Sequence, residues 1–263
     1  MGFSTSGLLF GTPQTGTAGT YHLTFVASNR VNPEATQSFT LTLDSPVCAN
    51  GKGPSLPDAV GIAAVSIFGC PGYFVASSAG QVAAFGSATT HGDLSGVHLD
   101  APIIAIAATP DGEGYWMLGA DGGIFTFGDA RFYGSTGGIK LNASVVSMAV
   151  APGGNGYWLV AQDGGVFTFT TDGFYGSLGD VHLFKPIVGM SSAPDGDGYT
   201  LVGADGGVFT FGKAPFYGSL GGNPPGSPIL DLSPAPADNG YYLVDSAGQI
   251  FAFGPGAKYF GNV

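Results

Sequence analysis

Two tryptophans lie at matching positions of a repeated pattern, and tryptophan can stack on the face of a sugar ring. Trp116 and Trp158 each follow a Gly-Tyr pair, and 42 residues separate them. Other copies of the pattern place Phe74, Thr200 and Tyr242 at this position. Such a series could form one weak pocket per copy and gain strength by multivalency. The alternative is packing between neighbouring copies, where aromatic side chains bury large areas, and we favour packing.

The copies disagree most clearly at Thr200, which interrupts the aromatic series. A site that serves one ligand is best sought where a repeat departs from its neighbours, because the uniform positions serve the architecture. We therefore keep the non-Phe members of the series as candidate ligand-binding residues: Trp116, Trp158, Thr200 and Tyr242.

Asp231 is a second place where the copies disagree. The matching positions 63, 105, 147 and 189 hold Ala, Ala, Ser and Gly, so Asp231 is the single acid in a series of small residues. Glycoside hydrolysis needs two carboxyl groups that flank the scissile bond. A lone carboxylate argues against that chemistry, and we keep Asp231 as a candidate ligand-binding residue. No nucleophile elbow, zinc-protease motif or phosphate-binding glycine loop occurs, so we predict no catalytic residue and no cofactor.

Acidic turns and histidines offer little for a metal. Asp111-Gly112-Glu113, Asp195-Gly196-Asp197 and Asp238-Asn239 carry the oxygen ligands that calcium prefers. Turn chemistry explains Asp and Gly at such places without a metal. His98 and His182 lie two repeats apart and are interpreted as solvated connector residues. We predict no metal site.

The elements that would position these residues follow from the repeat. Gly-Tyr pairs begin at residues 72, 114, 156, 198 and 240, always 42 residues apart, and a fixed period of this size indicates stacked supersecondary units. Each copy divides into four short apolar pieces separated by turns, with Asp-Gly hairpin signals in the central copies. The pattern predicts an all-β fold, a five-bladed β-propeller of four-stranded antiparallel blades. The expected blades are about 61–102, 103–144, 145–186, 187–228 and 229–263, and a β-solenoid is the less favoured alternative.

The remaining chain divides into two short zones. Residues 1–46 contain two alternating segments, 19–27 and 36–43, that predict strands, and residues 47–60 are rich in Gly and Pro and predict a linker before the propeller at 61–263. Cys48 and Cys70 are the two cysteines. Because no metal-ligand spacing exists and the composition is typical of extracellular proteins, we predict a disulfide that ties the linker to the first repeat, with two free thiols as the alternative.

Composition excludes several partners. The chain has a formal net charge of −11 and only 7 Lys and Arg residues, so no basic surface is available for nucleic acid. No apolar run reaches the length of a membrane span. The first residues lack the charged and apolar regions of a signal peptide, so the origin of any export signal stays open.

Two stretches resemble known families. Gly156–Val160, Asp163–Phe169 and Phe174–Ser177 resemble a tandem repeat common in exported proteins of actinobacteria, over residues 61 to 263. This resemblance implies an extracellular or cell-wall-associated accessory module, and it carries no ligand and no functional residue. Gly11–Tyr21 with Thr36–Leu43 resembles the second half of a bacterial Ig-like domain.

These observations favour a non-catalytic exported module that binds a cell-surface glycan or a surface protein. One alternative is a hydrolase, or a propeller associated with one. The other is a structural assembly subunit that self-associates through its N-terminal strands, because unpaired strand edges invite pairing with another chain.

Overall fold

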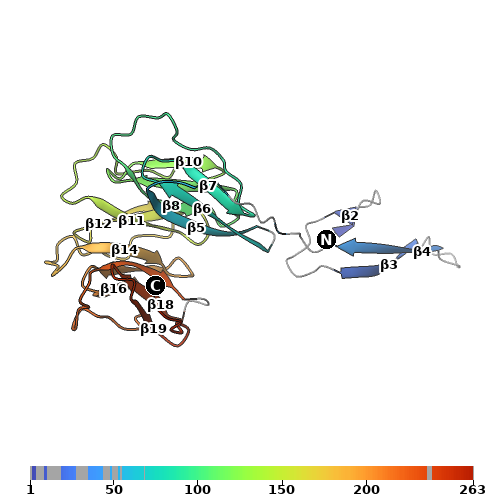
Figure 1. Cartoon of the computed structure of the whole chain (residues 1–263). Coiled ribbons are helices and arrows are strands. Elements are labelled where there is room, and N and C mark those ends of the chain that lie inside the picture. The colour runs from blue at the N-terminus through green and yellow to red at the C-terminus, as the bar shows by residue number, and fades with distance from the viewer. Residues whose placement is uncertain are drawn as a thin grey trace.

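The structure, a computed structural model, is built of β-strands, and the described residues contain no helix. It describes residues 2–3, 9–10, 19–27, 35–43, 48, 53, 55–67, 69–235 and 239–262. The N-terminal strands are β1 (Gly2–Phe3), β2 (Leu9–Phe10), β3 (Gly19–Ala27) and β4 (Ala35–Leu43). β1 pairs with β2 and β3 with β4, both antiparallel. Figure 1 shows these strands to one side of the repeats.

Each 42-residue repeat forms one three-stranded antiparallel sheet, in sequence order. Sheet 1 holds β5 (Ala59–Ile67), β6 (Cys70–Ser77) and β7 (Val82–Gly86), and sheet 2 holds β8 (Ile103–Ala108), β9 (Gly114–Gly119) and β10 (Ile124–Gly128). Sheet 3 holds β11 (Val145–Val150), β12 (Gly156–Ala161) and β13 (Val166–Thr170), and sheet 4 holds β14 (Ile187–Ser192), β15 (Gly198–Gly203) and β16 (Val208–Gly212). Sheet 5 holds β17 (Ile229–Pro234), β18 (Tyr241–Asp245) and β19 (Ile250–Phe253).

The Asp-Gly-Gly turns form the hairpins that the sequence predicts. In sheet 2, the Asp121 carboxylate accepts a hydrogen bond of 2.9 Å from the Gly123 N–H. Gly122 has a φ of +80°, a backbone conformation that L side chains rarely adopt. The first strand of every sheet also carries a register shift near its start, as a β-bulge produces.

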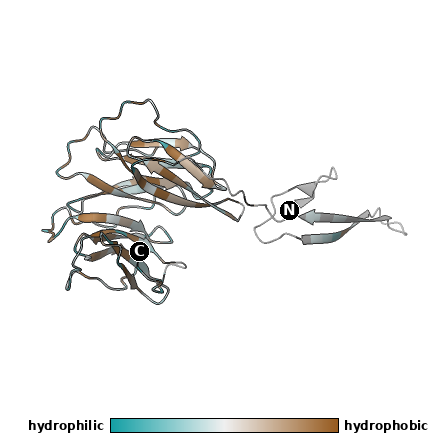
Figure 2. Cartoon of the chain, in the orientation of Figure 1, coloured by the Kyte–Doolittle hydropathy of each residue, from teal (hydrophilic) through white to brown (hydrophobic). Residues whose placement is uncertain are grey.

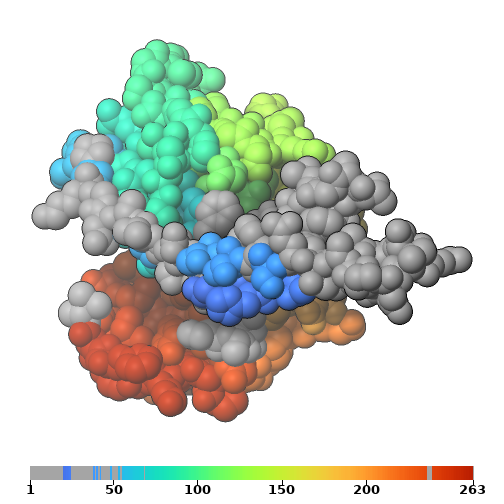
Figure 3. Space-filling view, turned by 90° about the vertical axis from the view of Figure 1, so that its right-hand side faces the viewer, coloured from blue at the N-terminus to red at the C-terminus, as the bar shows by residue number. Residues whose placement is uncertain are grey.

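The core lies between consecutive sheets. The middle strands β9, β12 and β15 are buried along their whole length. The first strands of neighbouring sheets contact one another in the series β5, β8, β11, β14 and β17. Among the described residues, β17 makes no comparable contact with β5. Figure 2 shows that the strands of these sheets are mostly hydrophobic, and Figure 3 shows sheet 5 (red) across from sheets 1 and 2 (blue-green).

The fourth piece of each repeat is not a strand, which differs from the prediction of four-stranded blades. Residues 131–136 have no regular structure and bond both to their own sheet and to the following one. The Tyr157 hydroxyl, from β12, accepts a hydrogen bond of 3.2 Å from the Tyr133 N–H and donates one of 2.6 Å to the Gly134 carbonyl. Because these backbone groups pair with a side chain, they form no strand ladder.

The same arrangement recurs at the other junctions. The Tyr199 hydroxyl accepts a hydrogen bond from the Tyr175 N–H and donates one to the Gly176 carbonyl. The Tyr241 hydroxyl bonds the Tyr217 N–H and the Gly218 carbonyl in the same way, and the four distances lie between 2.5 and 3.2 Å. Tyr115 bonds His91 and Gly92 in the same way. We call these four residues the joint tyrosines: Tyr115, Tyr157, Tyr199 and Tyr241. The Gly-Tyr repeat of the sequence is therefore the device that fastens each sheet to the segment before it.

Sheet 1 has a different partner at this place. Its Tyr73 is 38% exposed, whereas the joint tyrosines are at most 4% exposed, and the Tyr73 hydroxyl bonds no described residue. Gly53 of the linker lies against Phe85, since a Cβ there would be 3.0 Å from the ring. Gly134 takes the same place against Phe169 of sheet 3. The linker thus covers the first sheet where other sheets receive the preceding repeat.

The predicted disulfide is confirmed. Cys48 and Cys70 are bonded, with 5.2 Å between their Cα atoms, and Cys70 begins β6. The bond fastens the linker to the sheet that Gly53 covers. An intramolecular disulfide indicates a non-reducing environment.

Candidate functional site

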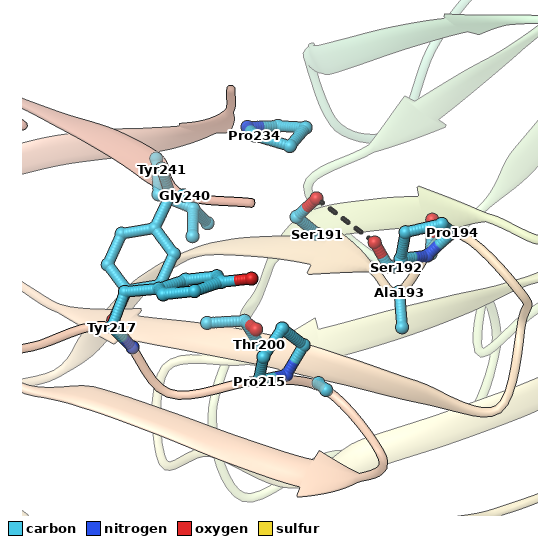
Figure 4. Close-up of a pocket in the computed structure, with 12 residues that line it drawn as sticks. Ser191, Ser192, Ala193, Pro194, Thr200, Pro215, Tyr217, Pro234, Gly240 and Tyr241 are labelled. Atoms are coloured by element: carbon cyan, nitrogen blue, oxygen red, sulfur yellow. Dashed lines mark hydrogen bonds between the residues drawn. The ribbon is translucent and has the colours of Figure 1, made fainter. Parts of the chain in front are cut away.

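A small pocket lies between sheets 4 and 5, at the residue where the repeats disagree. Its volume is about 30 Å³, and Thr200 of β15 forms part of its wall. Figure 4 shows Tyr217 and Tyr241 on one side and Ser191 on the other, with Pro215 next to Thr200. Among the described residues that line it, none has a charged side chain.

The matching residues in sheets 2 and 3 are tryptophans, and a larger pocket of about 370 Å³ lies beside Trp116 in sheet 2. The Trp116 indole N–H donates a hydrogen bond of 2.8 Å to the Arg131 carbonyl. The Trp158 indole makes the same 2.8 Å bond to the Gly173 carbonyl. Each indole also packs against the joint tyrosine of the following sheet, with ring centroids 5.9 and 5.6 Å apart. Both tryptophans are buried, so they serve packing and are not available to stack on a ligand.

Thr200 leaves part of this indole space unfilled. The matching backbone carbonyl is that of Pro215, 42 residues after Gly173. Within the described part of the chain, this carbonyl has no hydrogen-bond donor, and the buried Thr200 side chain bonds no other residue. The pocket therefore offers one unused acceptor and one unused hydroxyl.

Tyr242 stands apart from this pocket. It is half-buried in β18 and pairs with Ser233 and Ala252. Among the described residues, Tyr242 makes no ring contact like those of Trp116 and Trp158 with a joint tyrosine. The structure does not bring Tyr242 together with Thr200.

Asp231 lies on β17 and faces the neighbouring sheet. A Cβ at Gly189 of β14 would come within 2.6 Å of the Asp231 Oδ1 atom, so the glycine of sheet 4 makes room for the acid of sheet 5. Asp231 is solvent-accessible, yet the surrounding strands desolvate its carboxylate and raise its pKa. A 2.8 Å hydrogen bond from the Leu232 N–H lowers the pKa in part, and no described carboxylate contributes to the shift.

The acidic turn in sheet 2 is held by its own hydrogen bonds. The Asp111 carboxylate accepts from the Thr109 hydroxyl at 2.8 Å and from the Glu113 N–H at 3.2 Å. These two bonds lower the pKa of Asp111. Among the described residues, no group of three or more His, Cys, Asp and Glu side chains could hold a metal ion. Asp238 lies outside the described residues.

Sequence reasoning missed a row of exposed aromatic side chains. We define the aromatic row as the first aromatic of the fourth piece in sheets 2 to 5, with the exposed fractions Phe132 61%, Phe174 59%, Phe216 59% and Tyr259 59%. In sheets 2 to 4 each precedes a tyrosine whose N–H bonds a joint tyrosine of the following sheet, and adjacent residues of an extended segment point to opposite sides. The repeated Phe-Tyr-Gly-Ser motif is the available signal, but its composition also suits the fourth strand that the sequence predicts for each blade.

Comparisons with known proteins bear on the fold. Residues 1–44 match the family described as "Putative Ig domain". No curated protein matches the chain. Among 639 matching chains of solved structures is one in the "Crystal Structure of Mitotic Checkpoint Complex", 13% identical, with a TM-score of 0.54. The match covers 82% of this chain and 72% of that one, and it shows an all-β, propeller-like fold. No helix that could cross a membrane occurs in the described residues.

Proposed function

We propose that this chain is a non-catalytic exported binding module that recognises a cell-surface glycan or a surface protein through its aromatic row. Propeller-like folds of packed sheets suggest interaction modules, and the disulfide supports export. The observation that carries the proposal is the exposure of the same aromatic residue in sheet after sheet. Exposed aromatic side chains repeated on one scaffold could each supply one weak contact and act together by multivalency.

The energetics favour a repetitive ligand. A ligand that covers about 50 Å² of one exposed ring gains roughly 1 kcal/mol of binding free energy, at about 25 cal/mol per Å² of buried apolar surface. One such contact is too weak to hold a partner. Four contacts on one rigid scaffold add avidity, because the later ones form within an existing complex. A polymer with a repeating surface, such as a glycan, suits this arrangement.

The proposed architecture behind the site is a five-bladed propeller. Sheets 1 to 5 would be the blades over residues 61–263, and the irregular fourth piece would be the outer element of each blade. Residues 1–46 would be a partial Ig-like segment and 47–60 the linker. The five three-stranded sheets and the regular joint between consecutive sheets support this division.

The test removes the aromatic row and keeps the fold. The triple variant F132A/F174A/F216A should lose most binding to purified bacterial cell-envelope material in a pull-down. The variant F184A is the matched control, because Phe184 is exposed but lies outside the row. Equal retention of wild type, control and triple variant would refute the proposal.

A second function, structural assembly through the N-terminal strands, has one observation in its favour. Within the described residues, β3 and β4 make substantial contacts only with each other, and an edge of such a two-stranded pair could accept a strand of another chain. Light scattering of the whole chain and of a variant without residues 1–46 tests it. A monomeric whole chain would refute this second function. No observation favours a hydrolase.

A further inference from the structure

The segment that follows sheet 5 has the backbone shape of one half of a joint. Gly134, Gly176 and Gly218 have φ values of +131°, +133° and +137°, and a Cβ on each would lie between 2.5 and 2.6 Å from a phenylalanine ring of the following sheet. Their counterpart Gly261 has a φ of +122°, and a Cβ there would meet no described residue within 4 Å. The neighbouring Phe260 is 86% exposed. This segment therefore keeps the joint conformation without a partner among the described residues.

Sheet 1 carries the matching half. Tyr73 is 38% exposed, and its hydroxyl bonds no described residue. Val75 of the same strand is half-buried, whereas its counterparts in the other four sheets are 0% exposed. A joint tyrosine bonds one backbone N–H and one carbonyl, and the Phe260 N–H and the Gly261 carbonyl bond no described residue. The two incomplete halves thus complement each other.

We propose that sheet 5 of one copy docks onto sheet 1 of a second copy, where the Tyr73 hydroxyl bonds the Phe260 N–H and the Gly261 carbonyl. This contact would continue, from one chain to the next, the series of joints that fastens sheets 1 to 5. Within the described part of one chain, β17 makes no substantial contact with β5, so the two halves do not meet in the same copy. A head-to-tail contact of this kind generates rings or chains of copies. It goes beyond the proposed function, because binding of envelope material needs no second copy.

The linker competes for the same surface of sheet 1. Gly53 lies against Phe85 as Gly134 lies against Phe169, and the Cys48–Cys70 bond tethers the linker there. A tethered segment competes at a high effective concentration, so it should hold off the second copy. The described part of the linker leaves the Tyr73 hydroxyl unbonded, and exchange for sheet 5 would supply both missing hydrogen bonds. Release of the linker should therefore strengthen the association.

The experiment measures self-association of the whole chain by sedimentation velocity over a range of protein concentrations. The variant G53A keeps the disulfide and seats the linker poorly, because the added Cβ would lie 2.7 Å from the Ala84 carbonyl oxygen and 3.0 Å from the Phe85 ring. The double variant C48S/C70S releases the linker by a second route. Both should associate at least about tenfold more tightly than the wild type, because a tethered competitor is weakened.

Two further substitutions in the G53A background locate the contact. Y73F removes the hydroxyl, and G261A places a Cβ where the Phe85 ring of the second copy would lie. Each should weaken the association about tenfold, as the loss of one or two hydrogen bonds or of their geometry provides. G222A is the matched control, since a Cβ at Gly222 would meet nothing within 4 Å and Gly222 lies outside the joints.

The outcomes decide between this contact and others. Association of G53A no tighter than that of the wild type overturns the proposal, and G53A serves alone if C48S/C70S fails to fold in the urea experiment. Association that Y73F and G261A leave unchanged also overturns it. If deletion of residues 1–46 then abolishes that association, the contact lies in the N-terminal strands instead. Weaker association in Y73F and G261A, with none of this loss in G222A, supports the proposal whatever the envelope pull-down shows.

Discussion

The hydroxyl of a joint tyrosine should be worth a measurable part of the stability, and Tyr157 is the best place to test this. Its hydroxyl is bonded at 3.2 Å to the Tyr133 N–H and at 2.6 Å to the Gly134 carbonyl, and the residue is buried. The variant Y157F removes both bonds and leaves two backbone groups without this partner. Each lost bond costs roughly 1 kcal/mol, with more where water cannot replace it. We expect a loss of about 2 kcal/mol.

The chain supplies its own control for this experiment. Tyr73 occupies the same position in sheet 1, but it is 38% exposed and its hydroxyl bonds no described residue, so Y73F should change the stability by less than about 0.5 kcal/mol. Urea denaturation followed by tyrosine and tryptophan fluorescence measures both variants. Equal effects of Y157F and Y73F would show that the hydroxyl does not fasten the sheets.

Three further predictions concern other contacts. Reduction of the Cys48–Cys70 bond, which spans 22 residues, should lower the stability of the first sheet by up to about 3 kcal/mol, and an unchanged melting temperature with reductant would contradict this. The variant G189A should cost little stability, because its Cβ meets the movable end of the Asp231 side chain, and the double variant G189A/D231A should be about as stable as G189A in the same urea experiment. Desolvation raises the pKa of the joint tyrosines, so unfolded tyrosines ionise first as the pH rises above about 10. The free energy of unfolding should be constant below about pH 10 and should decrease as the pH rises through the folded-state pKa values of these tyrosines. The Y157F variant has one such tyrosine fewer, so its free energy of unfolding should decrease less steeply.

The sequence allowed the repeated sheets to be predicted well, because their signal is local. The period, the Asp-Gly turns and the alternating apolar residues identify three strands per repeat, and the strand expected at 19–27 is β3. The fourth piece could not be assigned in this way. Its composition suits a strand, but its Tyr133 N–H bonds a hydroxyl 24 residues later, and no local pattern reports that partner.

The candidate site was predictable only as a disagreement between copies. Thr200 and Asp231 both stand out in an alignment of the repeats. What each one contacts depends on the neighbouring sheet: Thr200 opens space beside Tyr241, and Asp231 needs the glycine at 189. The exposure of Phe132 and its counterparts also follows from the joint rather than from hydrophobicity, which alone would have placed these residues in the core.

The joint between the sheets has a direction, and this affects how the array can change in length. Every internal sheet presents a joint tyrosine to the segment before it and offers a Tyr-Gly segment to the sheet after it. A complete 42-residue unit inserted between two sheets brings one joint tyrosine and one Tyr-Gly segment. Both therefore find a partner in the neighbouring sheets. Sheet 1 is different, because Gly53 and the disulfide already occupy its receiving side. Duplication within the array therefore preserves every contact, whereas a unit added before sheet 1 would have to displace the linker.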